Sequence, residues 1–199
     1  MSKTTRQTQK EQTKEALLQT AYVLFSEHGI LNTRMSDIAQ AAGVSHGTVF
    51  LHFKTQEALI TEVIEVYCGK IAARTHELTE GCESVQGILR AHLDGIMEFE
   101  PFYTNLVIES RLLPLSARDA WVHTQSAVSF HFSTAVEREL KTEIPTSLLF
   151  NMWIGLIHYY LANSDLFAPG GKVMERYGET LIENYMKLIQ GQTNSFKSL

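Results

Sequence analysis

The sequence predicts an all-α protein, and two observations lead to that prediction. Apolar residues recur at the three- and four-residue spacings of amphipathic helices along most of the 199 residues. No stretch of useful length alternates between apolar and polar residues as a strand does. We therefore predict an N-terminal three-helix domain, which contains a helix-turn-helix, followed by a larger domain of about five or six helices.

The first helix is predicted near residues 9–28. Leu17, Ala21 and Phe25 fall at i, i+4 and i+8, so they share one face, and Gly29 ends the pattern. A helix of this kind needs partners that cover its apolar stripe.

The segment 35–53 predicts two short helices around one tight turn. Thr33 is the expected N-cap of the first, whose apolar face includes Ile38. Gly43 ends that helix, because glycine takes a positive φ without steric cost. Ser45 is placed to cap the second helix by accepting its free backbone N–H groups. This is the arrangement that enters a DNA major groove.

A longer helix is predicted over residues 55–78, where Leu59, Val63 and Tyr67 repeat at i+4. It links the two domains, which we place at residues 1–54 and 55–199. Beyond it, caps and prolines predict further helices; their approximate ranges are 84–98, 101–113, 116–143, 146–164 and 172–189.

Three pieces in this order resemble the DNA-binding domain of the TetR family of bacterial transcriptional regulators. They are A-x-x-L-F-S-E-x-G at 21–29, I-A-x-A-A-G-V-S at 38–45 and G-T-V-F-x-H-F-K at 47–54. The resemblance implies a homodimer that binds a double-stranded, palindromic DNA operator. It also implies a repressor released by a small-molecule effector, hydrophobic or aromatic, and neither an enzyme nor a protein with a cofactor. Two distant cysteines with no secretory segment before them make a reduced cytoplasmic protein the simplest interpretation.

The start of the second short helix is expected to face the bases. His46 and Thr48 are candidates for base contact, Gly47 lets the backbone approach closely, and Ser45 suits a phosphate. The full set predicted to contact DNA is Arg34, Ser36, Ser45, His46, Gly47, Thr48, Phe50, Leu51 and Lys54.

Three residues depart from the family pattern. A lysine is usual where this chain has His46, a tyrosine where it has Phe50, and a tyrosine or histidine where it has Leu51. Phe50 and Leu51 have no hydroxyl to hold a phosphate, and His46 is mostly neutral near pH 7. We therefore expect DNA binding with a shallow salt dependence.

The resemblance also implies an effector pocket and a dimer interface in the second domain. The candidates to line the pocket are Phe99, Phe102, Tyr103, Trp121, His123, Phe130, Trp153 and His158. The helix at 146–164 is too apolar for an ordinary surface helix, so it either joins an intermolecular four-helix bundle or lies in the monomer core. The candidates for the interface are Trp153, Leu156, Tyr160, Tyr177, Leu181 and Tyr185.

The distribution of charge agrees with an N-terminal DNA-binding domain followed by an acidic second domain. Residues 1–60 contain six Lys and Arg against five Asp and Glu, a net charge of +1, so with −5 for the whole chain the remaining residues carry −6. Cys68 and Cys82 lie too far apart for a CxxC site, and the N-terminus is polar, unlike a signal peptide. No run is long enough to span a membrane.

Two other kinds of site have partial matches in the sequence. Residues 43–47 match the G-x-S-x-G elbow of serine hydrolases, which needs a preceding strand where we expect a helix. His76 with Glu80, and Asp119 with His123, are i, i+4 pairs that can share an ion. We predict no bound metal, but a metal-responsive regulator on the same scaffold stays an alternative, as does a helical protein that no longer binds DNA.

Overall fold

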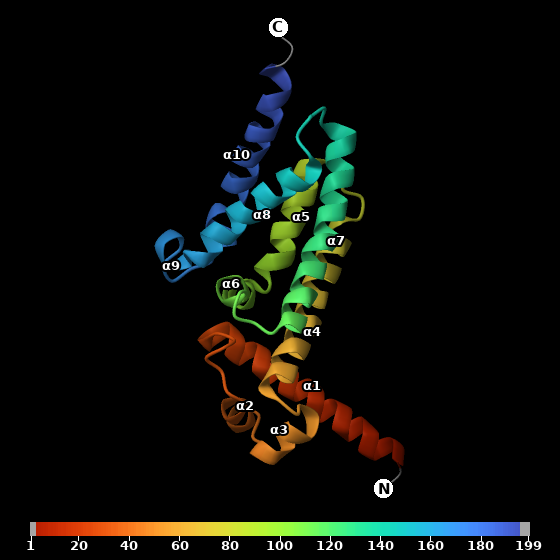
Figure 1. Ribbon diagram of the computed structural model, residues 1–199, viewed down its shortest axis with the longest axis vertical. Helices are drawn as coiled ribbons and strands as arrows, with labels where there is room; N and C mark the ends of the chain where they lie inside the picture. Colours follow the sequence, from red (N-terminus) through yellow and green to blue (C-terminus); the bar gives the residue numbers. More distant parts are fainter. Residues whose placement is uncertain (1–2, 196–199) are drawn as a thin grey trace. The chain divides into compact units, whose positions relative to one another are not determined.

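The computed structural model describes residues 3–195, and over that range the chain forms ten helices and no strand (Figure 1). The all-α prediction is confirmed. The helices are α1 (Lys3–His28), α2 (Met35–Ala41), α3 (His46–His52), α4 (Gln56–Thr79), α5 (Val85–Met97), α6 (Glu100–Glu109), α7 (Leu115–Glu139), α8 (Thr146–Ala162), α9 (Ser164–Phe167) and α10 (Val173–Ser195). Within this described part, no helix is long and apolar enough to cross a membrane.

The helices pack into two compact units, each with its own core. Unit 1 comprises Met1–Cys68 and Pro101–Trp121, and unit 2 comprises Gly69–Glu100 and Val122–Leu199. Helices α4 and α7 therefore contribute to both units. The domain boundary predicted between residues 54 and 55 stays a prediction.

The core of unit 1 forms around the stripe that the sequence predicts on α1. Leu17, Ala21 and Phe25 are fully buried. Removing a side chain the size of Leu17 or Phe25 from water is worth about 1.5–3 kcal/mol. The other elements of the unit each supply buried partners: Ile38 from α2, Val49 from α3, Leu59 and Val63 from α4, and Phe102 and Leu106 from α6.

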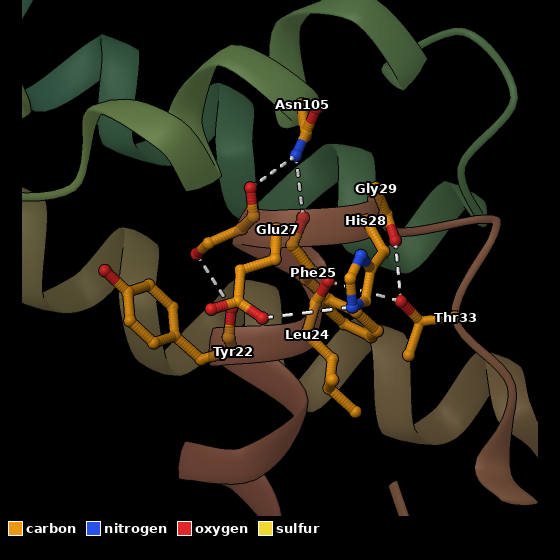
Figure 2. A network of polar contacts seen from close by, with 9 residues as sticks. Tyr22, Leu24, Phe25, Glu27, His28, Gly29, Thr33 and Asn105 are labelled. Carbon is orange, nitrogen blue, oxygen red and sulfur yellow. Dashed lines mark hydrogen bonds and ion pairs between the residues drawn. The ribbon is translucent and has the colours of Figure 1, made fainter. Parts of the chain in front are cut away.

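Side chains from elsewhere in unit 1 cap the C-terminal end of α1 (Figure 2). The last carbonyls of a helix have no partner within it and must find one outside. Asn105 of α6 donates from its side-chain nitrogen to the carbonyls of Phe25, at 2.7 Å, and Ser26, at 3.1 Å. The hydroxyl of Thr33 donates to the carbonyl of Gly29 at 2.8 Å.

Glu109, one turn after Asn105 on α6, holds the turn that follows α1. Its two carboxylate oxygens accept the backbone N–H groups of Ile30, at 3.1 Å, and Leu31, at 2.7 Å. Gly29 begins this turn with a φ of +91°, and a Cβ there would lie 2.6 Å from Oε1 of Glu109. The positive φ favours glycine here, and any larger residue would also have to displace the carboxylate of Glu109.

The core of unit 2 is built on α5, α8 and α10, with α10 packed along α5 and against α8 (Figure 1). Trp153 is fully buried and donates from Nε1 to Nδ1 of His92 at 3.0 Å. The hydroxyl of Tyr185 donates to the carbonyl of Leu149 at 2.6 Å. The buried carboxylate of Glu100 accepts the first N–H groups of α10, so its burial at a helix N-terminus is compensated.

Two histidines inside unit 2 are held neutral. Burial lowers the pKa of His92 to about 3 and that of His158 to about 4, and in His92 the neighbouring His158 adds to the effect. In the unfolded chain both regain a pKa near 6.5. The unfolded state thus binds more protons below pH 6.5, and acid favours it.

We predict that the free energy of unfolding falls as the pH is lowered from 7 to 5. The stability from neutral His158 is complete above pH 6.5 and is lost as the pH falls toward 4. Urea denaturation at pH 7 and pH 5 measures this fall in the free energy of unfolding. In His158→Gln the fall should be about 1–2 kcal/mol smaller than in the parent. His123→Gln, at an exposed position, is the control and should behave as the parent. Equal pH dependence in parent and His158→Gln contradicts the prediction.

We predict that Gly29→Ala destabilises the protein more than Gly43→Ala. Both glycines have a positive φ, which costs an alanine about 1–2 kcal/mol. At Gly43 a Cβ meets nothing within 4 Å, whereas at Gly29 it displaces Glu109 and weakens charge-assisted hydrogen bonds worth about 1.5–3 kcal/mol each. Chemical denaturation of the two variants tests this, and equal losses would refute it.

Candidate nucleic-acid interface

Helices α2 and α3 are joined by a tight turn whose geometry follows from Gly43. Gly43 has a φ of +66°, and the N–H of Val44 returns to the carbonyl of Ala39 at 3.0 Å, which ends α2. Oγ of Ser45 accepts the N–H of Thr48 at 3.1 Å and so caps α3. The glycine turn and the serine cap are both confirmed.

The start of α2 differs from the prediction. Arg34, not Thr33, is the N-cap, and its backbone N–H donates to Oδ2 of Asp37 at 2.8 Å. The Thr33 prediction is wrong because that hydroxyl bonds the carbonyl of Gly29 instead. Ser36 is exposed on the first turn of α2, with Oγ 3.3 Å from Oδ1 of Asp37.

One side of α3 packs inward and the other is exposed. Val49 is fully buried, as is Phe53 directly after the helix. The exposed side, which we name the outer face of α3, consists of His46, Gly47, Phe50 and Leu51.

Contacts within α3 and with its cap hold the side chains of His46 and Thr48, the two residues predicted to contact bases. The rings of His46 and Phe50 meet edge to face, with centroids 4.8 Å apart. Thr48 is half-buried, and its hydroxyl lies 2.9 Å from Oγ of Ser45. The hydroxyl of Thr48 is therefore engaged with the cap, whereas the imidazole of His46 lies on the outer face of α3.

The residues predicted to contact DNA all lie in unit 1, on or beside α2 and α3. Arg34 precedes α2, Lys54 follows α3, and both are exposed. The structure thus brings the set together on adjoining elements, with every member except Thr48 exposed. Their contacts with DNA stay predictions.

His52 belongs to the packing of α3 against α1. Its Nδ1 is buried without a hydrogen-bond partner among the described residues. Burial lowers its pKa, and the nearby charges of Lys10 and Lys14 on α1 lower it further. Lys14 also pairs with Glu62 and lies 5.8 Å above the ring of Phe53. Helix α1 therefore lies against the end of α3, on the side where His52 and Phe53 are covered.

Asn105 and Glu109 position this site, and neither is among the residues predicted from the sequence. They hold the end of α1 and the turn that leads into α2, through bonds to residues about 80 positions away. An Asn and a Glu at i, i+4 on a helix are ordinary solvated residues by pattern alone. No signal in a single sequence identifies their partners.

The residues predicted to line an effector pocket are divided between the two units. Phe102, Tyr103 and Trp121 belong to unit 1; Phe99, His123, Phe130, Trp153 and His158 belong to unit 2. Phe102, Tyr103 and Trp153 are buried core residues, whereas Phe130 is 70% exposed. The pocket itself stays a prediction.

A shallow pocket of about 200 Å³ lies in unit 2 between α5 and α10, and none of the predicted residues lines it. Its apolar walls come from Leu93, Met97, Met174 and Ile182, and the ion pair of Arg90 with Glu179 lies at its edge.

The residues predicted for a dimer interface are largely used inside unit 2. Trp153, Leu181 and Tyr185 are buried. Tyr160 stacks on Phe167 with centroids 4.2 Å apart. A side chain already covered within its own chain has little surface to offer a second copy. The exposed apolar residues of α8 are different ones, namely Leu148, Met152 and Tyr159.

The pairs considered for metal binding form no larger cluster. His76 meets His131 of α7, with Nδ1 and Nε2 3.2 Å apart. Among the described residues, no group of three or more His, Cys, Asp or Glu side chains is placed to hold an ion. The G-x-S-x-G match at residues 43–47 follows α2 rather than a strand.

Comparison with known proteins agrees with this geometry. The family model described as "Bacterial regulatory proteins, tetR family" matches residues 17–63. The transcriptional repressor KstR2 of Mycolicibacterium smegmatis is 29% identical over 87 residues, which are 42% of this chain and 42% of that protein. The regulator AcrR of Shigella flexneri is 36% identical over 66 residues, which are 33% of this chain and 30% of that protein. The matched segments thus span less than half the length of these relatives.

Solved structures share the fold over most of the chain. The fatty acid degradation regulator FadR of Bacillus halodurans has a TM-score of 0.72 at 16% identity and covers 92% of this chain and 96% of its own. The TetR family regulator PfmR of Thermus thermophilus has a TM-score of 0.67 at 19% identity, covering 87% and 96%. The matched segment contains α2, the Gly43 turn and α3, so residues 17–63 have the sequence pattern of the TetR family of bacterial transcriptional regulators, and the chain shares the fold of solved members of that family.

Proposed function

We propose that the protein is a transcriptional regulator that binds a palindromic DNA operator through the outer face of α3. The observation that carries this proposal is the exposed outer face on a helix whose other side is buried and whose start is capped. A helix presented in this way fits the B-DNA major groove, where base edges are distinguishable. Arg34 and Lys54, at the two ends of the α2–α3 segment, would hold the phosphate backbone.

We infer that the protein acts as a homodimer. A seven-residue helix reaches few base pairs, whereas a two-fold dimer reads two half-sites about 34–36 Å apart. Leu148, Met152 and Tyr159 form an exposed apolar face on α8, and Leu188 of α10 is 65% exposed. An exposed apolar face of this kind supports the dimer, because a second copy would cover it. In the proposed interface these residues replace the buried core residues predicted from the sequence.

The proposed action is repression that a small hydrophobic or aromatic effector relieves. Repression is supported by the relative KstR2, a transcriptional repressor. A structural neighbour, FadR of Bacillus subtilis, was solved with stearoyl-CoA, so this fold accommodates an apolar ligand. Relief of repression requires that the effector bind the DNA-free conformation more tightly than the DNA-bound one.

Selection from a random duplex library tests the proposal. We predict enrichment of a two-fold symmetric site by the parent protein. Gly47→Glu should weaken binding to that site at least about 100-fold, because it places a carboxylate on the outer face of α3, toward the phosphates. Within 4 Å, a Cβ at Gly47 meets only Oγ of Ser45, at 3.7 Å, and the position is exposed, so the variant should fold.

Gly69→Glu is the matched control. Gly69 is exposed on α4, and a Cβ there meets nothing within 4 Å. It should bind the enriched duplex as the parent does. No enrichment by the parent, or unchanged affinity in Gly47→Glu, would refute the proposal.

We also predict a shallow salt dependence that His46→Lys makes steeper. Residues 34–54 contain only Arg34 and Lys54 as permanent cations, so about four phosphates are neutralised per dimer. The slope of log K against log salt should then be about −4. One lysine per subunit adds about two phosphate contacts, which shifts the slope by about −2. His123→Lys, outside the site, should leave it unchanged; an unchanged slope in His46→Lys would place residue 46 away from the backbone.

A further inference from the structure

The outer face of α3 is apolar where it should meet bases. Leu51 is 69% exposed and Phe50 is 39% exposed, on consecutive positions of the helix. Isolated apolar residues are ordinary on a protein surface. Here, however, the two form half of the face that would enter the major groove, so their chemistry bears on which bases are read.

Helix α3 also has few of the polar side chains that read bases. Its sequence, HGTVFLH, contains no Arg or Lys, which pair with guanine, and no Asn or Gln, which pair with adenine. The Thr48 hydroxyl lies 2.9 Å from Oγ of Ser45, and Nδ1 of His52 is buried. Among the side chains of α3, hydrogen bonding to bases thus rests chiefly on the imidazole of His46.

The major groove offers one apolar group that such a face can bind, the C5-methyl group of thymine. We propose that Phe50 and Leu51 determine operator specificity by packing on pyrimidine C5-methyl groups. This inference rests on the proposed DNA binding. The rings of His46 and Phe50 pack edge to face, so an imidazole beside a bound methyl group would be held close to the same base pair. The same methyl group is present in 5-methylcytosine, so the chemistry recognised is the methyl group rather than thymine as such.

The test uses the duplex enriched by selection with the full-length protein. Each thymine of the half-sites is replaced in turn by uracil, which removes only the methyl group. For at least one position, affinity should fall about fourfold per half-site, and about 15-fold when both half-sites are changed, the value expected for exposing one methyl group. Changing that thymine to cytosine should weaken binding, and 5-methylcytosine should restore part of it.

Variants assign the effect to residues. In Leu51→Ala or Phe50→Ala the ratio of affinities for thymine and uracil duplexes should approach one at the sensitive position. Both side chains are exposed, so the substitutions leave the core intact. Leu166→Ala, at a position of α9 that is 70% exposed, is the matched control and should retain the parent ratio.

Each outcome separates this inference from the proposed function. An enriched site that binds equally well with uracil at every thymine overturns the methyl readout but leaves DNA binding intact. A thymine preference that persists in both Leu51→Ala and Phe50→Ala also overturns it. Failure of the parent to enrich any duplex overturns both proposals.

Discussion

The hydrogen bonds that Asn105 and Glu109 make to the end of α1 are the interaction on which the candidate site depends. Without them, carbonyls of α1 and two N–H groups of the following turn lose their partners, at a cost of about 1–3 kcal/mol for each buried group. The turn they hold leads directly into α2. Helix α6 thus fixes where the α2–α3 segment begins, and a glycine at residue 29, with its positive φ, lets the carboxylate of Glu109 approach the turn closely.

Local chemistry explains why the geometry of α2, the turn and α3 could be predicted from the sequence. The positive φ of Gly43, the cap at Ser45 and the inward side chain of Val49 each follow from residues within a few positions of one another. The same holds for the buried stripe of α1. By contrast, the cap predicted at Thr33 is wrong because its hydroxyl can either accept an N–H of α2 or donate to the carbonyl of Gly29. Only the packed turn decides for the carbonyl.

The spacing of apolar residues could not predict which side chains of α8 are buried in unit 2, because α8 has two apolar faces. Trp153 lies on the face that packs in the core, and Met152 on the exposed one, yet both fit a helical repeat. Hydropathy alone gives no reason to prefer either. The outer face of α3 shows the converse: Phe50 and Leu51 are apolar but exposed, which is consistent with a surface that a partner covers.

Hydrogen–deuterium exchange, with and without the selected duplex, tests the central claim that the outer face of α3 is where DNA binds. The account predicts that DNA slows exchange across residues 34–54, since these backbone amides would be covered by the duplex. Protection confined to other helices, with the exchange of residues 34–54 unchanged, would contradict it.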